Sequence, residues 1–94
     1  MSAYVEAVKR SYMSIEDLAN SLSQIRHTQP DVYERTIGNL LDLTTFLFEQ
    51  AQFHLDRLFH SEKIPLDEAI NYESELRKQS NDLIQHIVST SKKS

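Results

Sequence analysis

The fold is decided by the stretch from Pro30 to His60, PDVYERTIGNLLDLTTFLFEQAQFHLDRLFH. On a helical projection of about 100° per residue, most of its apolar side chains fall on one arc, as in an amphipathic helix that faces a core. The predicted core arc consists of Tyr33, Ile37, Leu40, Leu41, Thr44, Leu47, Phe48, Ala51, His54, Leu55, Leu58 and Phe59. Pro30 suits a first helical turn, and Asp31 follows where the helix dipole favours a carboxylate. We therefore expect a central helix over residues 30–60.

A second apolar strip of this stretch lies outside the core arc. Phe46 and Phe53 are seven residues apart, which is two helical turns along one line, and Leu43 lies beside them. The whole strip consists of Asn39, Leu43, Phe46, Gln50, Phe53 and Arg57. Two interpretations are open: a neighbouring helix of the same chain covers the strip, or the strip is an interface with another chain, since contiguous exposed aromatic residues mark interaction sites. The second interpretation predicts a homodimer in which two copies of this helix pair about a two-fold axis.

Two further helices are predicted, one on each side of the central one. The first covers about residues 2–27, where apolar residues recur in steps of three and four: Val5, Val8, Tyr12, Ile15, Ala19 and Leu22. The second covers 65–89, with an apolar stripe of Leu66, Ala69, Ile70, Tyr72, Leu76, Leu83, Ile84, Ile87 and Val88 that Glu73 and Ser80 interrupt. Residues 90–94 are polar, and we expect them to fray into a tail. Short connections make successive helices antiparallel neighbours.

The composition agrees with an all-α chain. The 94 residues include one Gly and two Pro, which leaves little punctuation for strands or tight turns. The chain has no Cys, which excludes disulfides and thiolate metal sites. The predicted fold is a single domain over residues 1–94, an all-α antiparallel three-helix bundle with a long central helix, which self-associates.

Charge and hydropathy narrow the possible partners. A net charge of −4 disfavours a general nucleic-acid binder, which needs a basic face for the phosphates. No apolar run approaches the roughly 20 residues that span a bilayer, and the N-terminus lacks a signal-peptide pattern. We expect a soluble, cytoplasmic protein that binds another protein and not a membrane.

Neither catalytic nor metal-binding motifs occur in the chain. His54 lies at the edge of the core arc, on the side from which Glu73 of the third helix can reach it, but a metal site needs three or four converging ligands. We expect either a polar pair of these two residues or a satisfied core histidine. Asp56 and His60, four residues apart, form an ordinary surface pair. The single glycine, Gly38, cannot form a phosphate-binding loop and projects outward from the central helix. No catalytic, cofactor-binding or metal-binding residue is predicted.

Three hypotheses for the function follow. The leading one is a non-enzymatic protein-interaction module of adaptor, regulator, inhibitor or chaperone type, which acts through the strip of the central helix. An alternative is a nucleic-acid-associated regulator that acts as a dimer through Arg77, Lys78, Lys92 and Lys93. A third hypothesis is a magnesium-dependent helical nucleotide hydrolase that uses Glu73, Glu75 and Asp82.

Overall fold

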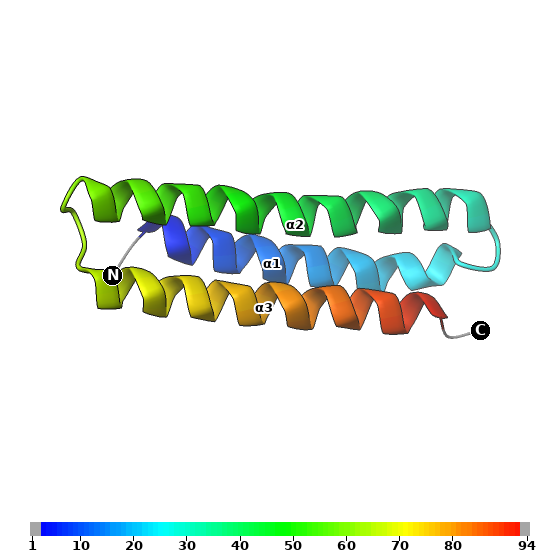
Figure 1. The fold of residues 1–94 in the computed structure, drawn as a ribbon. Helices are drawn as coiled ribbons and strands as arrows, with labels where there is room; N and C mark the ends of the chain where they lie inside the picture. Colours follow the sequence, from blue (N-terminus) through cyan, green and yellow to red (C-terminus); the bar gives the residue numbers. More distant parts are fainter. Residues whose placement is uncertain (1–2, 93–94) are drawn as a thin grey trace.

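The computed structural model describes residues 3–92 and forms a three-helix bundle about 52 Å long and 16 Å across (Figure 1). Helix α1 covers Ala3–Leu22, α2 covers Pro30–His60 and α3 covers Leu66–Lys92. A short 3₁₀ helix, η1, covers Ser23–Ile25 between α1 and α2. The described residues contain no β-strand, which confirms the all-α class and the helical bundle. The predicted helix start at residue 2 and the predicted tail at residues 93–94 fall outside the described residues.

The three helices lie side by side, and α1, with 20 residues, is shorter than α2 and α3 (Figure 1). Lys9 contacts Glu75 and Asn20 contacts His86, so the same step along α1 and α3 leads from one contact to the next. Helices α1 and α3 therefore run in the same direction. Helix α2 runs the opposite way, because each of the two connections turns the chain back on itself (Figure 1).

The core is formed by the apolar faces of all three helices. Its buried apolar residues are Val5, Val8, Tyr12, Ile15, Ala19, Tyr33, Ile37, Leu40, Ala51, Leu55, Leu76, Leu83 and Ile87. The core arc predicted for α2 is confirmed, since every member is buried or half-buried. Thr44 is its one fully buried polar residue, and its hydroxyl donates a hydrogen bond of 2.8 Å to the Leu40 carbonyl. This bond satisfies the hydroxyl within its own helix.

One part of the predicted α3 stripe is wrong, because Leu66 and Ile70 are 54% and 51% exposed. The line of α3 that enters the core passes through Leu76, Leu83 and Ile87. At 3.6 residues per turn, Leu66 and Ile70 lie on the flank of that line. The first two turns of α3 therefore present apolar side chains to the surface.

The helix ends also differ from their predicted positions. Helix α1 ends at Leu22 instead of residue 27, and the chain continues as the 3₁₀ turn η1. The Ser23 hydroxyl donates to the Asn20 carbonyl at 2.7 Å, and such side-chain bonds compete with the helical pattern. Helix α3 continues to Lys92 instead of ending at residue 89, so residues 90–92 are helical.

Arg26 explains why the last turn of α3 is held in place. Its guanidinium donates to the backbone carbonyls of Thr90 at 2.7 Å and Ser91 at 2.5 Å. These carbonyls belong to the last helical turn, which has no partners of its own within the helix. The same guanidinium lies 5.8 Å from the centre of the Tyr33 ring. Arg26 therefore joins the η1 turn to α3 and to the start of α2.

The connection between α2 and α3 contains a left-handed residue, Glu62, at φ 58°. The N–H of Lys63 donates to the Leu58 carbonyl at 2.8 Å, and the N–H of Glu62 donates to the Phe59 carbonyl at 3.0 Å. These two bonds form a Schellman motif, in which Gly usually occupies the left-handed position. The turn places the first residues of α3 beside the last turns of α2.

Candidate protein-interaction surface

The strip predicted on α2 lies on the surface of the bundle. Leu43, Phe46 and Phe53 are 42%, 55% and 64% exposed. The polar members of the strip, Asn39, Gln50 and Arg57, are exposed as well. The interpretation that a neighbouring helix of the same chain covers the strip is therefore wrong for the described residues. An interface with another chain remains a prediction.

The spacing of the strip is that of a helix-pairing seam. From Asn39 to Arg57 its members follow one another in alternating steps of four and three residues. The same alternation continues backward through Thr36 to Val32, which is 44% exposed. Alternating steps of this kind keep one line of side chains facing a partner helix. The seam thus covers most of the length of α2.

The side of the strip that faces α1 is hollowed. A groove of about 660 Å³ between α1 and α2 is lined by Ala7, Arg10, Ser11, Ser14, Ile15, Leu43 and Leu47. Three of the α1 residues here are Ala or Ser, and small side chains let a neighbouring helix come close. The strip member Leu43 forms part of this groove, so the groove and the strip are one continuous surface.

The other side of the strip carries negative charge. Asp42, Glu49 and Asp56 follow one another in steps of seven residues, and all three are exposed. Residues at this spacing lie on one line of a helix, two turns apart. Asp56 also contacts His60 at 3.5 Å, which confirms the predicted surface pair. An acidic row therefore borders the strip on the side away from α1.

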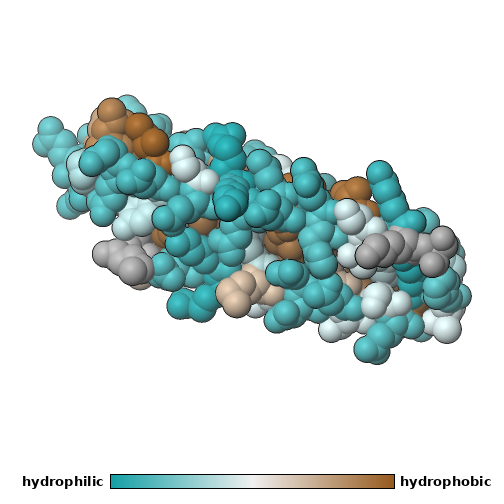
Figure 2. All heavy atoms as spheres, turned by 90° about the horizontal axis from the view of Figure 1, so that it is seen from below, coloured by the Kyte–Doolittle hydropathy of each residue, from teal (hydrophilic) through white to brown (hydrophobic). Residues whose placement is uncertain are grey.

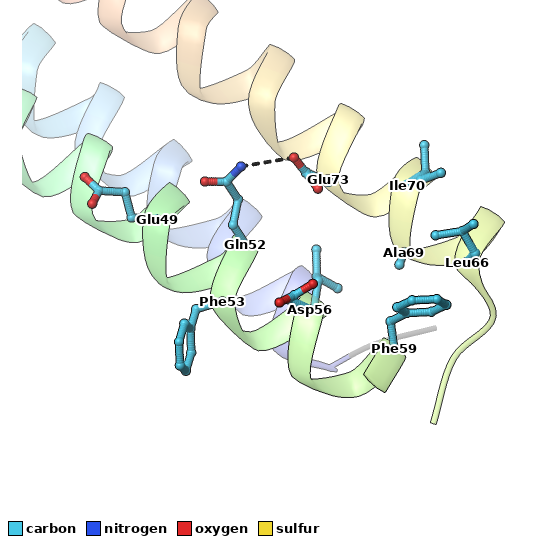
Figure 3. A pocket seen from close by; sticks show the side chains of 10 residues that line it. Glu49, Gln52, Phe53, Asp56, Phe59, Leu66, Ala69, Ile70 and Glu73 are labelled. Atoms are coloured by element: carbon cyan, nitrogen blue, oxygen red, sulfur yellow. Dashed lines mark hydrogen bonds between the residues drawn. The ribbon is translucent and has the colours of Figure 1, made fainter. Parts of the chain in front are cut away.

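A second groove, with part of the acidic row along its edge, lies between the last turns of α2 and the first turns of α3 (Figure 3). It measures about 490 Å³ and is lined by Glu49, Gln52, Phe53, Leu55, Asp56, Phe59, Leu66, Ala69, Ile70 and Glu73. The Phe59 ring faces Leu66 and Ala69, whereas the Phe53 ring points away from α3 (Figure 3). Seen from below, hydrophobic atoms gather at the end of the molecule that carries the α2–α3 connection (Figure 2).

Of the two alternatives for His54, the polar pair with Glu73 is wrong. The His54 ring stacks on Tyr4 of α1, with 4.3 Å between the ring centres. The Glu73 carboxylate accepts hydrogen bonds from the Gln52 amide at 3.0 Å and from the Arg77 guanidinium at 2.8 Å. These two bonds lower the pKa of Glu73 because they favour its charged form, and the bond from Gln52 has the larger effect. His54 lies on the flank of α2 that faces α1, whereas Glu73 contacts the flank of α2 that faces α3.

The three carboxylates of the magnesium hypothesis do not converge. Glu73 lies on the side of α3 that faces α2, while Glu75 forms an ion pair of 2.7 Å with Lys9 of α1. Asp82 lines a surface groove together with Glu75, Lys9 and Lys78. Within residues 3–92 no three His, Asp or Glu side chains are placed so that they can hold a metal ion.

The basic residues of the nucleic-acid hypothesis do not form one surface in the described part of the chain. Arg77 bonds to Glu73 and lies 5.1 Å from the centre of the Phe48 ring. Lys78 points in another direction from α3, into the groove that Asp82 lines, and Lys92 ends the helix. Lys93 lies outside the described residues. Arg77 and Lys78 each lie near a carboxylate, which opposes phosphate binding.

In residues 3–92 no helix is both long enough and apolar enough to cross a bilayer. Comparison of the chain with protein families, with curated proteins and with solved structures gives no match. The surface must therefore be interpreted from its own geometry.

The sequence analysis missed the apolar part of the second groove, Leu66 and Ile70. It assigned both residues to the core because they belong to an apolar repeat. The signal that separates them is their phase: Leu76, Leu83 and Ile87 recur on one line of α3, and Leu66 and Ile70 lie off that line.

Proposed function

We propose that this protein is a cytoplasmic, non-enzymatic helical interaction module of adaptor, regulator, inhibitor or chaperone type, which binds protein through the strip on α2 and pairs with a second copy of itself. The observation that supports the proposal is the exposure of Leu43, Phe46 and Phe53 at 42%, 55% and 64% along a single line. Exposed apolar surface of this extent, bordered by polar residues, is typical of interaction sites.

The free energy of burying the strip does not by itself ensure that a dimer forms, so the α1–α2 groove beside the strip is expected to contribute. Full burial of a Leu or Phe side chain is worth about 1.5–3 kcal/mol, whereas association costs about 4–15 kcal/mol in lost freedom of movement. Burial of the three apolar side chains of each copy therefore offsets the cost of association only if that cost lies in the lower part of its range. Contacts of the α1–α2 groove with the second copy are therefore part of the proposal, since Ala7, Ser11 and Ser14 leave room there for a neighbouring helix.

Charge favours one direction of pairing. If the two-fold axis were perpendicular to α2, equal flanks would meet, and the acidic row Asp42, Glu49 and Asp56 would face its own copy. Rows of like charge that face one another across an interface oppose association. A two-fold axis parallel to α2 brings the acidic row to the α1 side of the second copy, where Arg10 lines the groove. We therefore propose that the two copies of α2 run in the same direction.

Sedimentation measurements test the self-association. The wild type is expected to sediment as a dimer at tens of micromolar, and the double variant Phe46→Asp/Phe53→Asp as a helical monomer, because a buried unpaired charge opposes association. Met13→Asp is the matched control, since Met13 is 60% exposed on α1 away from the strip, and this variant should remain dimeric. A monomeric wild type would overturn self-association.

Crosslinking tests the direction of pairing, because the chain has no native Cys. The two single variants Asn39→Cys and Arg57→Cys mark the two ends of the strip. In the proposed parallel pair each variant crosslinks to its own copy under mild oxidation. In an antiparallel pair only a mixture of the two variants crosslinks. Absence of crosslinks in all samples would show that the strip is not the interface.

A further inference from the structure

The groove between the end of α2 and the start of α3 has an apolar floor, and the α3 part of this floor lies outside the core of the bundle. Leu66 and Ile70 are about half exposed on α3, and Phe59 and Ala69 are half-buried beside them. Leu55 is buried at the bottom of the groove. A bound apolar side chain would therefore contact apolar atoms from both helices at once (Figure 3).

All charged side chains that line this groove are acidic: Glu49, Asp56 and Glu73. Glu73 already bonds to Arg77 and Gln52, so its charge is largely balanced within the chain. Glu49 and Asp56 are exposed, and the Asp56 carboxylate lies 3.5 Å from the ring of its surface neighbour His60. The groove thus combines an apolar floor with a rim of negative charge that lacks a matching basic residue in its lining.

We propose that this groove is a second binding site, distinct from the strip, that takes a short amphipathic helix of another protein with apolar side chains on one face and Lys or Arg along its edges. Charge complementarity selects this occupant, because the acidic rim attracts basic side chains and repels the phosphates of nucleic acids and anionic lipids. The apolar floor supplies the contacts that bind the apolar face of the helix.

The dimensions of the groove fit two to three turns of helix. Its α3 lining runs from Leu66 to Glu73, which is roughly 10 Å at 1.5 Å per residue, and its α2 lining runs from Glu49 to Phe59, roughly 15 Å. The hydrogen bond from Gln52 to Glu73 crosses from α2 to α3 and closes the groove on one side (Figure 3). A helix of this length presents apolar side chains at three successive turns.

The groove and the strip adjoin along the acidic row, whose Glu49 and Asp56 line the groove, but most of their side chains differ. The strip continues toward α1 through Leu43, whereas the groove is completed by α3. Phe53 borders both surfaces, and its ring points away from the groove (Figure 3). Variants of Ile70 and of Phe46 therefore separate the two functions.

The test uses three designed helical peptides of equal length that share one leucine face and carry Lys, Gln or Glu along the edges. The Lys peptide is expected to bind the full chain at least about tenfold more tightly than the Glu peptide at low salt, with a difference that shrinks as salt is added. The NMR signals that shift should be those of the groove residues, Leu66 and Ile70 first.

Matched variants identify the site. Ile70→Asn should weaken the Lys peptide about tenfold and leave self-association unchanged, whereas Met13→Asn, at an equally exposed apolar position outside the groove, should change neither. Asp56→Asn should weaken the Lys peptide more than the Gln peptide, which isolates the charge contribution. Phe46→Asp should abolish self-association and keep peptide binding, so failure of one proposal is distinguishable from failure of the other. Equal affinity for the Lys and Glu peptides, no binding of the Lys peptide, or binding that Ile70→Asn leaves intact would overturn the groove proposal.

Discussion

The two apolar lines of α2 contain the same kinds of side chain in opposite environments. Leu40 and Leu55 on the core face are 6% and 2% exposed, whereas Phe46 and Phe53 on the strip are more than half exposed. Both lines are apolar and both follow helical spacing, so hydrophobicity alone does not distinguish them. What distinguishes them is whether α1 and α3 lie over them. The comparison implies that one line holds the bundle together, while the other is free to contact a different molecule.

The largest expected effect separates the two lines directly. Leu55→Ala should lower the free energy of unfolding by about 2–5 kcal/mol, because it leaves a cavity in the core. Phe53→Ala should change it by no more than about 0.5 kcal/mol at protein concentrations where the chain is monomeric, since an exposed side chain loses little. Urea denaturation followed by circular dichroism measures both values. Similar losses for the two variants would show that the strip belongs to the core after all.

Leu47 tests where the boundary between the two lines falls. Its position in the core arc predicts the full cavity cost for Leu47→Ala, about 2–5 kcal/mol. In the structure Leu47 is half-buried and lines the open α1–α2 groove. We therefore expect a smaller loss of about 1–2 kcal/mol, because water replaces part of the removed side chain. A loss as large as that of Leu55→Ala would mean that this groove is closed in solution.

Gly38 lies on the outer side of α2, and a Cβ atom added there meets nothing within 4 Å. Gly38→Ala should raise the free energy of unfolding by about 0.5–1 kcal/mol, because alanine is the better helix former. Thermal unfolding of dilute protein measures the gain. If the same substitution weakens the dimer in sedimentation, the glycine serves a close approach of another backbone, and the interface extends beyond the strip.

The smallest expected effect is the pH dependence of stability that Glu73 produces where α2 and α3 meet. Because the pKa of Glu73 is lowered in the folded chain, its contribution to stability is present above the ordinary value of 4.5 and is lost as the pH falls through the folded pKa. The side chain is 38% exposed, so we expect less than about 1 kcal/mol. Unfolding measured between pH 7 and pH 3 should show this loss in the wild type and not in Glu73→Gln. Glu49→Gln, on the outer face, is the control and should behave like the wild type.

The sequence was sufficient for those features that depend on helical phase. The core arc of α2 follows from a period of 3.6 residues. The same period placed the strip outside that arc but left open whether a neighbouring helix or another chain covers it. The groove was not predictable in this way, since Leu66 and Ile70 belong to an apolar repeat and only their phase relative to Leu76 and Leu83 separates them. The left-handed conformation of Glu62 in the α2–α3 connection was not predictable either, because glycine usually occupies such a position.

Arg26 has a consequence for which mutations the end of the bundle tolerates. The two groups that accept its hydrogen bonds are the backbone carbonyls of Thr90 and Ser91. Every residue type has the same backbone carbonyl, whatever its side chain. Substitutions at these two positions therefore leave the acceptors in place. A one-residue deletion within α3 would instead rotate the last turn by about 100° and move both carbonyls away from the guanidinium. This end of the protein thus tolerates changes of residue identity and is sensitive to changes of length.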